Sequence, residues 1–190
     1  MSYRQRLAAS APGKETVVTI GVFDGVHQGH RHLLRQVIEL AGDQYVPTVV
    51  TFSNRPITVL RPGTEPSYLT TLEQRIDLIK EQGIQTVISL EFTLELAQVA
   101  AADFASGLSE SLMMKGLVVG PDSAIGKDRQ GDLVFMQQQG ERLGFWARSV
   151  DTLEIEGQPV KSRRIREAVA SGNLEVCPGL LGRNHTLSGV

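Results

Sequence analysis

The feature that most constrains the fold is an alternation of short apolar runs with longer segments of helical periodicity. The apolar runs lie at residues 17–22, 46–52, 86–90, 117–120 and 145–150, and the helical segments between them at 31–42, 70–83, 101–114 and 133–144. The first run is β-branched at most positions, which is typical of a strand buried on both faces. Parallel strands need crossover connections, which are usually helices. We therefore expect an α/β fold with a five-stranded parallel sheet and helices on both faces.

Composition favours one domain in a reducing compartment. The chain has 190 residues, of which 41% are hydrophobic, and can bury one substantial core. We expect a leader over residues 1–15 and a domain over residues 16–182. Cys177, the single cysteine, cannot form an intramolecular disulfide, which suits the cytoplasm. The net charge of −2 gives no basic field for nucleic acid or an anionic membrane, and no apolar run approaches the roughly 18 residues of a membrane span. The oligomeric state is left open.

A glycine- and histidine-bearing stretch, GVFDGVHQGH at residues 21–30, directly follows the first strand. Gly25 and Gly29 permit close backbone approach, and a helix that begins near Gly29 or His30 would direct free N–H groups toward a phosphate. His27 and His30 could donate hydrogen bonds to phosphate oxygens and stabilise charge during phosphoryl or nucleotidyl transfer. The alternatives are a surface histidine beside a helix cap, and a zinc site with His32 that lacks a cysteine or acidic ligands to complete it.

A second basic stretch, KSRRIR at residues 161–166, begins a predicted helix. Ser162 is expected to cap that helix, and the backbone beside it with Arg163, Arg164 and Arg166 could hold a polyanion. The alternative is a solvated basic face. Together with the histidine stretch, the pattern predicts a triphosphate held between two helix N-termini, at the carboxyl ends of the strands.

Two loops add candidate residues at the same edge of the sheet. The stretch GPDSAIGK at residues 120–127 has five residues between its glycines, and Asp128 stands where a P-loop needs Ser or Thr, so it is not a P-loop. This loop could instead bring Asp122, Lys127 or Arg129 over a ligand, although a plain surface loop is the alternative. Asn54 lies in a turn after the second apolar run.

The motifs occur in the order of a known family. GVFDGVHQGH, a TF…P turn, LTTLEQR, a VVG loop ending in GD, and SRRIREAVASGNLE followed by LLGR appear in sequence. Together they resemble the FAD synthetase (FMN adenylyltransferase) module of bacterial bifunctional riboflavin kinase/FAD synthetases. The resemblance implies a Rossmann-like nucleotidyltransferase fold in which ATP and FMN, with Mg²⁺, give FAD and pyrophosphate.

The resemblance also assigns residues. It implies phosphate binding by His27 and His30, and contacts with ATP phosphates by Ser162, Ile165 and Arg166 of an SSTxIR-type segment, with Arg163 beside them. The family's loop that shapes the nucleotide site is matched by Gly21, Phe23, Asp24 and Gly29. The Asp or Asn that the family has in the loop after the fourth strand is matched by Asp122. Asn54 is counted among the ligand-binding candidates, and no residue is predicted to be a metal ligand.

Several positions depart from the family pattern. Lys161 and Arg163 replace two hydroxyl residues, Arg55 replaces a histidine, and Ser123 and Ile125 replace aromatic rings on which a flavin could stack. The alternatives are therefore a nucleotidyltransferase with another phosphorylated acceptor, or a non-catalytic nucleotide- or flavin-binding module. Residues 183–190 resemble the linker toward a riboflavin kinase module, and no flavokinase activity is expected of this polypeptide.

Overall fold

The core of the protein is a parallel sheet of five strands. The computed structural model describes residues 1–64 and 67–186. The strands follow the order β3-β2-β1-β4-β5 and pair in parallel; they are β1 (Thr16–Ile20), β2 (Val46–Phe52), β3 (Thr86–Leu90), β4 (Met114–Val119) and β5 (Trp146–Ser149). The α/β fold and the five parallel strands predicted from the alternation are confirmed.

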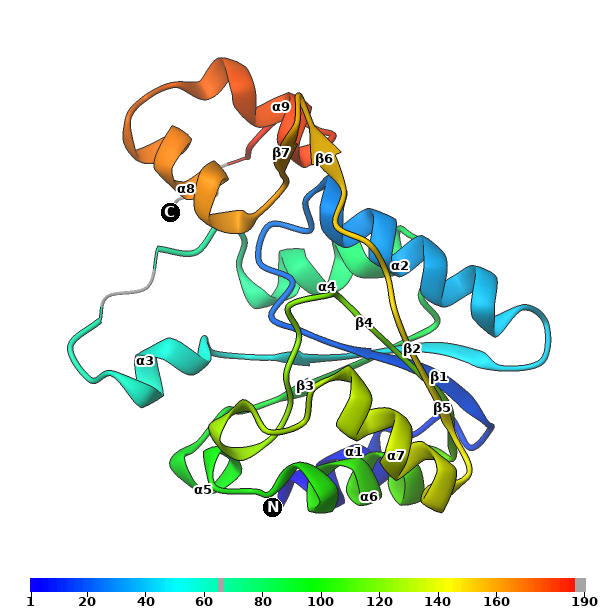
Figure 1. Cartoon of the computed structure of the whole chain (residues 1–190). Coiled ribbons are helices and arrows are strands. Elements are labelled where there is room, and N and C mark those ends of the chain that lie inside the picture. The colour runs from blue at the N-terminus through cyan, green and yellow to red at the C-terminus, as the bar shows by residue number, and fades with distance from the viewer. Residues whose placement is uncertain (65–66, 187–190) are drawn as a thin grey trace.

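Helices cover both faces of the sheet (Figure 1). One face carries α2 (Gln28–Ala41) and α4 (Leu72–Lys80), and the other carries α1 (Tyr3–Ala9), α6 (Ala101–Leu112) and α7 (Leu133–Leu143). The short helices α3 (Pro56–Leu60) and α5 (Leu94–Ala97) and the 3-10 turn η1 (Lys127–Arg129) lie in the connections. This arrangement places the sheet between two helical layers, as predicted.

The β-branched strands are explained by burial on both faces. Side chains alternate along a strand, and Val17 packs in the cluster under α2 while Val18 packs in the cluster with α6. Both side chains are 0% exposed. Val18 pairs in register with Thr48 of β2 and Leu117 of β4. Each central strand therefore contributes to two apolar cores.

The first fifteen residues are not a separate leader, and that prediction was wrong. Ser2 and Gln5 form a capping box that begins α1, and Leu7 is 0% exposed in the core cluster of α6. The rings of Tyr3 and Phe104 stack with centroids 5.4 Å apart. Short amphipathic helices become stable when tertiary packing covers their apolar side, and α1 belongs to the folded domain for this reason.

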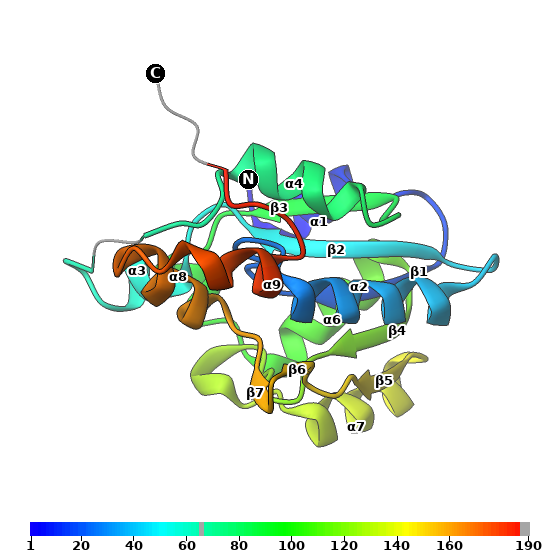
Figure 2. The same cartoon turned by 90° about the horizontal axis from the view of Figure 1, so that it is seen from above.

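The C-terminal part forms a third apolar cluster beside the beginning of α2 (Figure 2). It contains the hairpin β6 (Glu154–Ile155) and β7 (Gln158–Pro159), then α8 (Ser162–Ala170), the 3-10 turn η2 (Leu174–Val176) and α9 (Cys177–Leu181). Of the expected linker at residues 183–190, residues 187–190 lie outside the described residues. Across residues 1–64 and 67–186, no helix has the length and apolar character needed to cross a membrane.

Candidate active site

A cavity of about 260 Å³ opens at the carboxyl ends of β1, β4 and β5. Strands β2 and β3 lie on one side of β1, while β4 and β5 lie on the other, so the chain reverses its direction of winding between β1 and β4. Open parallel sheets bind ligands at this switch point. The wall comes from the loops after β1, β4 and β5 and from the segment before α8, and it includes Gly21, Phe23, His27, Gly29, His30, Asp122, Ser123, Asp151 and Lys161.

The loop between β1 and α2 has an unusual backbone. Phe23 has φ 53° and Val26 has φ 38°, both in the left-handed region that side chains disfavour. Burial holds them there, since Phe23 is 2% exposed and Val26 is 0% exposed. A Cβ on Gly21 would lie 3.1 Å from the Phe23 ring, and that ring meets His30 edge-on with centroids 5.1 Å apart. Gly21 and Phe23 thus shape the cavity wall beside the histidines.

The two histidines begin α2 and touch one another. His27 is the N-cap, and its Nδ1 accepts the His30 backbone N–H at 3.2 Å. The helix therefore begins slightly earlier than predicted, at Gln28. The two rings stack with centroids 3.6 Å apart. A Cβ on Gly29 would lie 3.2 Å from the His27 ring and 3.0 Å from the carbonyl oxygen of Val160. The glycine is needed because α2 approaches both groups closely.

Burial keeps both imidazoles neutral. It lowers the pKa of His27 from 6.5 to about 4, with smaller contributions from the positive charges of Arg166 and Arg183. Burial also lowers the pKa of His30 well below 6.5, with a further contribution from His27. Because Nδ1 of His27 accepts a hydrogen bond, the neutral ring carries its proton on Nε2. Near pH 7 the pair can act as hydrogen-bond donors, but not as a double positive charge.

Asp24 connects the histidine loop to two distant segments instead of facing the cavity. Its side chain is 3% exposed, and Oδ2 accepts a hydrogen bond from Arg166 Nη1 at 2.7 Å. Oδ1 accepts the backbone N–H groups of Leu69 at 2.9 Å and Thr70 at 3.3 Å. Asp24 and Arg166 are therefore brought together, behind the cavity wall that Phe23 and His27 form.

Ser162 also binds this loop and does not cap α8, contrary to the prediction. It is the first residue of the helix, and Lys161 occupies the N-cap position without a side-chain cap. The Ser162 hydroxyl donates to the backbone oxygen of Asp24 at 2.9 Å. Ser162 and Arg166, one turn apart on α8, both bind Asp24.

The mouth of the cavity carries an exposed ion pair. Lys161 Nζ lies 2.9 Å from Asp122 Oδ2, and this hydrogen bond, with the charge of Lys161, lowers the pKa of Asp122. Arg129 holds the same loop by donating to the backbone oxygen of Asp122 at 2.8 Å. Asp122 lies in the cavity wall, and its contact with a ligand stays a prediction.

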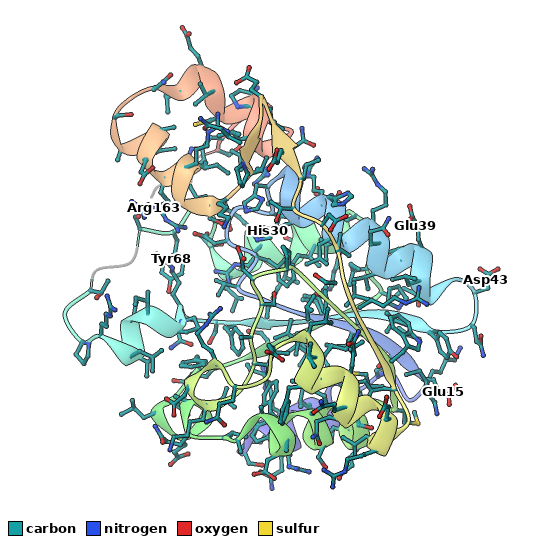
Figure 3. The ribbon with its side chains drawn as sticks, in the orientation of Figure 1. Glu15, His30, Glu39, Asp43, Tyr68 and Arg163 are labelled. Carbon is teal, nitrogen blue, oxygen red and sulfur yellow. The ribbon has the colours of Figure 1, made fainter. Side chains whose placement is uncertain are left out.

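Besides Asp24, Ser162 and Arg166, three further predicted residues are not in the cavity wall. Arg163 forms an ion pair with Glu167 at 2.7 Å on the exposed side of α8. Figure 3 labels Arg163 on this helix and His30 at the beginning of α2. Ile165 is 0% exposed in the C-terminal apolar cluster. Asn54 donates to the Phe92 carbonyl at 2.9 Å and accepts the Phe92 N–H at 2.8 Å. The Asn54 side chain therefore joins the loops after β2 and β3.

Comparison with known proteins assigns the family. The FAD synthetase family matches residues 10–164. The chain belongs to the FAD synthetase family. It is 34% identical to a bifunctional riboflavin kinase/FMN adenylyltransferase of Escherichia coli K12, over 95% of this chain and 58% of that protein. It is 36% identical to a bifunctional riboflavin kinase/FMN adenylyltransferase of Pseudomonas fluorescens, over 91% of this chain and 56% of that protein. The chain thus spans little more than half the length of these relatives, and the resemblance stated from the motifs is confirmed.

A solved structure from Streptococcus pneumoniae has the same fold as this FAD synthetase chain. That structure is described as a macrolide-efflux protein. Its TM-score is 0.84 and its sequence identity is 26%, and the match covers 93% of this chain and 58% of the Streptococcus pneumoniae chain. Sequence reasoning missed two residues at the site of this family member, Thr70 and Arg183, which bind the backbone of Gly25. Their only signal was membership of the LTTLEQR and LLGR motifs.

Proposed function

We propose that the chain transfers AMP from ATP to FMN, giving FAD and pyrophosphate. An FMN phosphate oxygen attacks the α-phosphorus of ATP, the bond between the α-phosphorus and the bridging oxygen breaks, and pyrophosphate leaves. The observation that carries the proposal is the stacked, neutral pair of His27 and His30 at the N-terminus of α2, in a cavity at the switch point of the sheet. Family membership supplies the nucleotide and the acceptor.

The cavity supplies groups suited to phosphate. The first turn of α2 presents backbone N–H groups and the positive end of the helix dipole. The Nε2–H of His27 adds a neutral donor, and Lys161 at the mouth adds a positive charge. Donors fixed in a partly buried site stabilise the charge that develops on the leaving pyrophosphate. No side chain needs to become covalently attached to the nucleotide.

The donor set fits a magnesium ion that enters with ATP. Within residues 1–64 and 67–186, no three His, Cys, Asp or Glu side chains gather to hold a metal ion. The carboxylates in the cavity wall are Asp122 and Asp151. Mg²⁺ is commonly held by one or two carboxylates together with substrate phosphates, and these two residues are the candidates. When bound, the ion would neutralise phosphate charge.

The identity of the phosphorylated acceptor is a separate question from that of the nucleotide. Ser123 lies in the cavity wall and Ile125 packs against the sheet core, so these two positions offer no ring to an isoalloxazine. A nucleotidyltransferase with another phosphorylated acceptor is therefore the second candidate. Cytoplasmic location stays a prediction, supported by the buried free thiol of Cys177.

The experiment combines the purified chain with ATP, MgCl₂ and FMN, and follows FAD by chromatography and pyrophosphate by an enzyme-coupled assay. We expect the two products in equal amounts. ATP binding by calorimetry without either product would favour the non-catalytic module. Pyrophosphate release with other phosphorylated acceptors, but not with FMN, would retain the transferase and replace the acceptor.

A further inference from the structure

Arg183, two residues after α9, reaches back to the loop that precedes the histidines. Its Nη2 donates to the backbone oxygen of Gly25 at 2.8 Å, and its Nη1 approaches the backbone oxygen of Val26 at 3.5 Å. The guanidinium is a planar fork of N–H donors, so it can bind two successive carbonyl groups at once. Arg183 is not part of the cavity wall, and it acts on the loop from behind.

The contact is reciprocal between two segments about 150 residues apart in sequence. Gln28 Nε2 donates to the backbone oxygen of Gly179 at 3.2 Å, and Arg31 Nη1 approaches that of Gly182 at 3.5 Å. The beginning of α2 therefore donates to the end of α9, while the residue after α9 donates to the loop before α2. Figure 2 shows α9 beside α2. Donors from each segment fix the other's position.

The loop that receives Arg183 depends on side chains for its shape. Gly25 has φ 80° and Val26 has φ 38°, and Val26 is immediately followed by His27. The Gly25 N–H is bound by the Thr70 hydroxyl at 3.1 Å, and the Gly25 carbonyl by Arg183. Both polar groups of this residue are thus held by side chains of other segments. A change at Gly25 turns the next peptide groups and moves the imidazoles.

We propose that Arg183 is a positioning residue of the adenylyl-transfer site. It holds the left-handed loop at residues 23–26 and thereby fixes His27 and His30 against the cavity. The proposal rests on the proposed function for its kinetic test, but not for its structural test. Phosphoryl chemistry depends on placement, and a misplacement of about 1 Å can reduce a rate about a hundredfold.

The kinetic test compares Arg183→Gln, Arg183→Lys and the control Arg142→Gln. Arg142 is exposed in the last turn of α7, on the opposite face of the sheet. We expect Arg183→Gln to lower kcat for FAD synthesis by about tenfold to a hundredfold, with the KM for ATP changed less than about threefold. Arg183→Lys should recover part of kcat, because an ammonium group can bind the Gly25 carbonyl alone. Arg142→Gln should stay within about twofold of the native kcat. An Arg183→Gln kcat within twofold of native, or an equal loss in Arg142→Gln, would overturn the proposal.

The structural test uses the imidazole resonances in NMR spectra of the same variants. We expect the His27 and His30 resonances to move in Arg183→Gln and to return toward their native positions in Arg183→Lys, while the His32 resonance stays in place. Unmoved His27 and His30 resonances would overturn the proposal. If the native chain makes no FAD, the proposed function fails, and moved resonances still support the positioning role.

Discussion

Asp24 and Arg166 form an ion pair at 2.7 Å that is almost removed from solvent, with side chains 3% and 18% exposed. The two residues are 142 positions apart, so the pair ties α8 to the loop that carries the histidines. An ion pair in this setting has lost most of its hydration, and each charge depends on the other for compensation. The pair therefore gives α8 a structural link to the site, alongside any contact with the nucleotide.

Removing the charge of Asp24 should destabilise the protein strongly. Asp24→Asn keeps an oxygen for the Leu69 and Thr70 N–H groups but leaves the Arg166 guanidinium without its anion. We expect the free energy of unfolding to fall by about 3 kcal/mol, measured by urea denaturation. The matched control is Asp122→Asn. Its ion pair with Lys161 is exposed, with side chains 78% and 58% exposed respectively, so its loss should change the stability little. Equal losses in the two variants would contradict a buried role for Asp24.

Replacing His30 should slow turnover without unfolding the protein. His30→Gln keeps a polar side chain but removes the ring that stacks on His27 at 3.6 Å. Loss of one fixed donor in a transition-state site costs about 10²–10³ in kcat, measured by FAD formation with circular dichroism as the fold check. His32→Gln, on the same helix, is the control and should retain turnover. A His30→Gln rate equal to native would remove this residue from the site.

The sheet and the histidine site could be predicted because their signals are local in sequence. The alternation of apolar runs with helical segments predicts parallel strands. A strand followed by Gly25, His27, Gly29 and His30 predicts a helix that begins at the sheet edge with geometry suited to phosphate. Both features depend on residues within one βα unit. The family order of the motifs then suggested the reaction proposed for this chain, which the fold alone leaves open.

The remaining contacts could not be predicted because they join segments far apart in sequence. Nothing periodic links Asp24 to Arg166, or Gly25 to Arg183, and these hydrogen bonds decide whether a polar residue faces the ligand or supports the loop. Asn54 was predicted to bind ligand, but its amide is used by Phe92. The leader was wrong for a similar reason, since Leu7 is buried by α6, about 100 residues later.

The glycine between the histidines should not tolerate a methyl group. Alanine is the better helix former, but a Cβ on Gly29 would lie 3.0 Å from the Val160 oxygen and 3.2 Å from the His27 ring. We expect Gly29→Ala to lower the free energy of unfolding by about 1–2 kcal/mol and to reduce kcat, because His27 must shift. Gly179→Ala in α9 is the control, since its Cβ would meet nothing within 4 Å. A Gly29→Ala variant as stable and active as native would show that α2 has room at this point.

Stability should fall as the pH falls from about 6.5 toward 4. The pKa of His27 is about 4 in the folded chain, against 6.5 for an ordinary histidine. Above pH 6.5 both states hold a neutral imidazole, and His27 adds no pH dependence. Between pH 6.5 and pH 4 the imidazole of His27 is protonated in the unfolded chain but stays neutral in the folded chain, and this difference favours unfolding. The free energy of unfolding has fallen by about 3 kcal/mol near pH 4 through His27 alone. The lowered pKa of His30 changes the stability in the same direction.

The measurement that isolates this effect compares the native chain with His27→Gln by urea denaturation between pH 7.5 and 4.5. The variant has no titrating group at position 27, so its stability curve should be flatter than the native curve over this range. Acidic side chains contribute to both curves, and the difference between the two chains removes their contribution. Parallel curves would mean that the His27 imidazole takes up protons in the folded state as readily as in the unfolded state, contrary to its burial in the cavity wall.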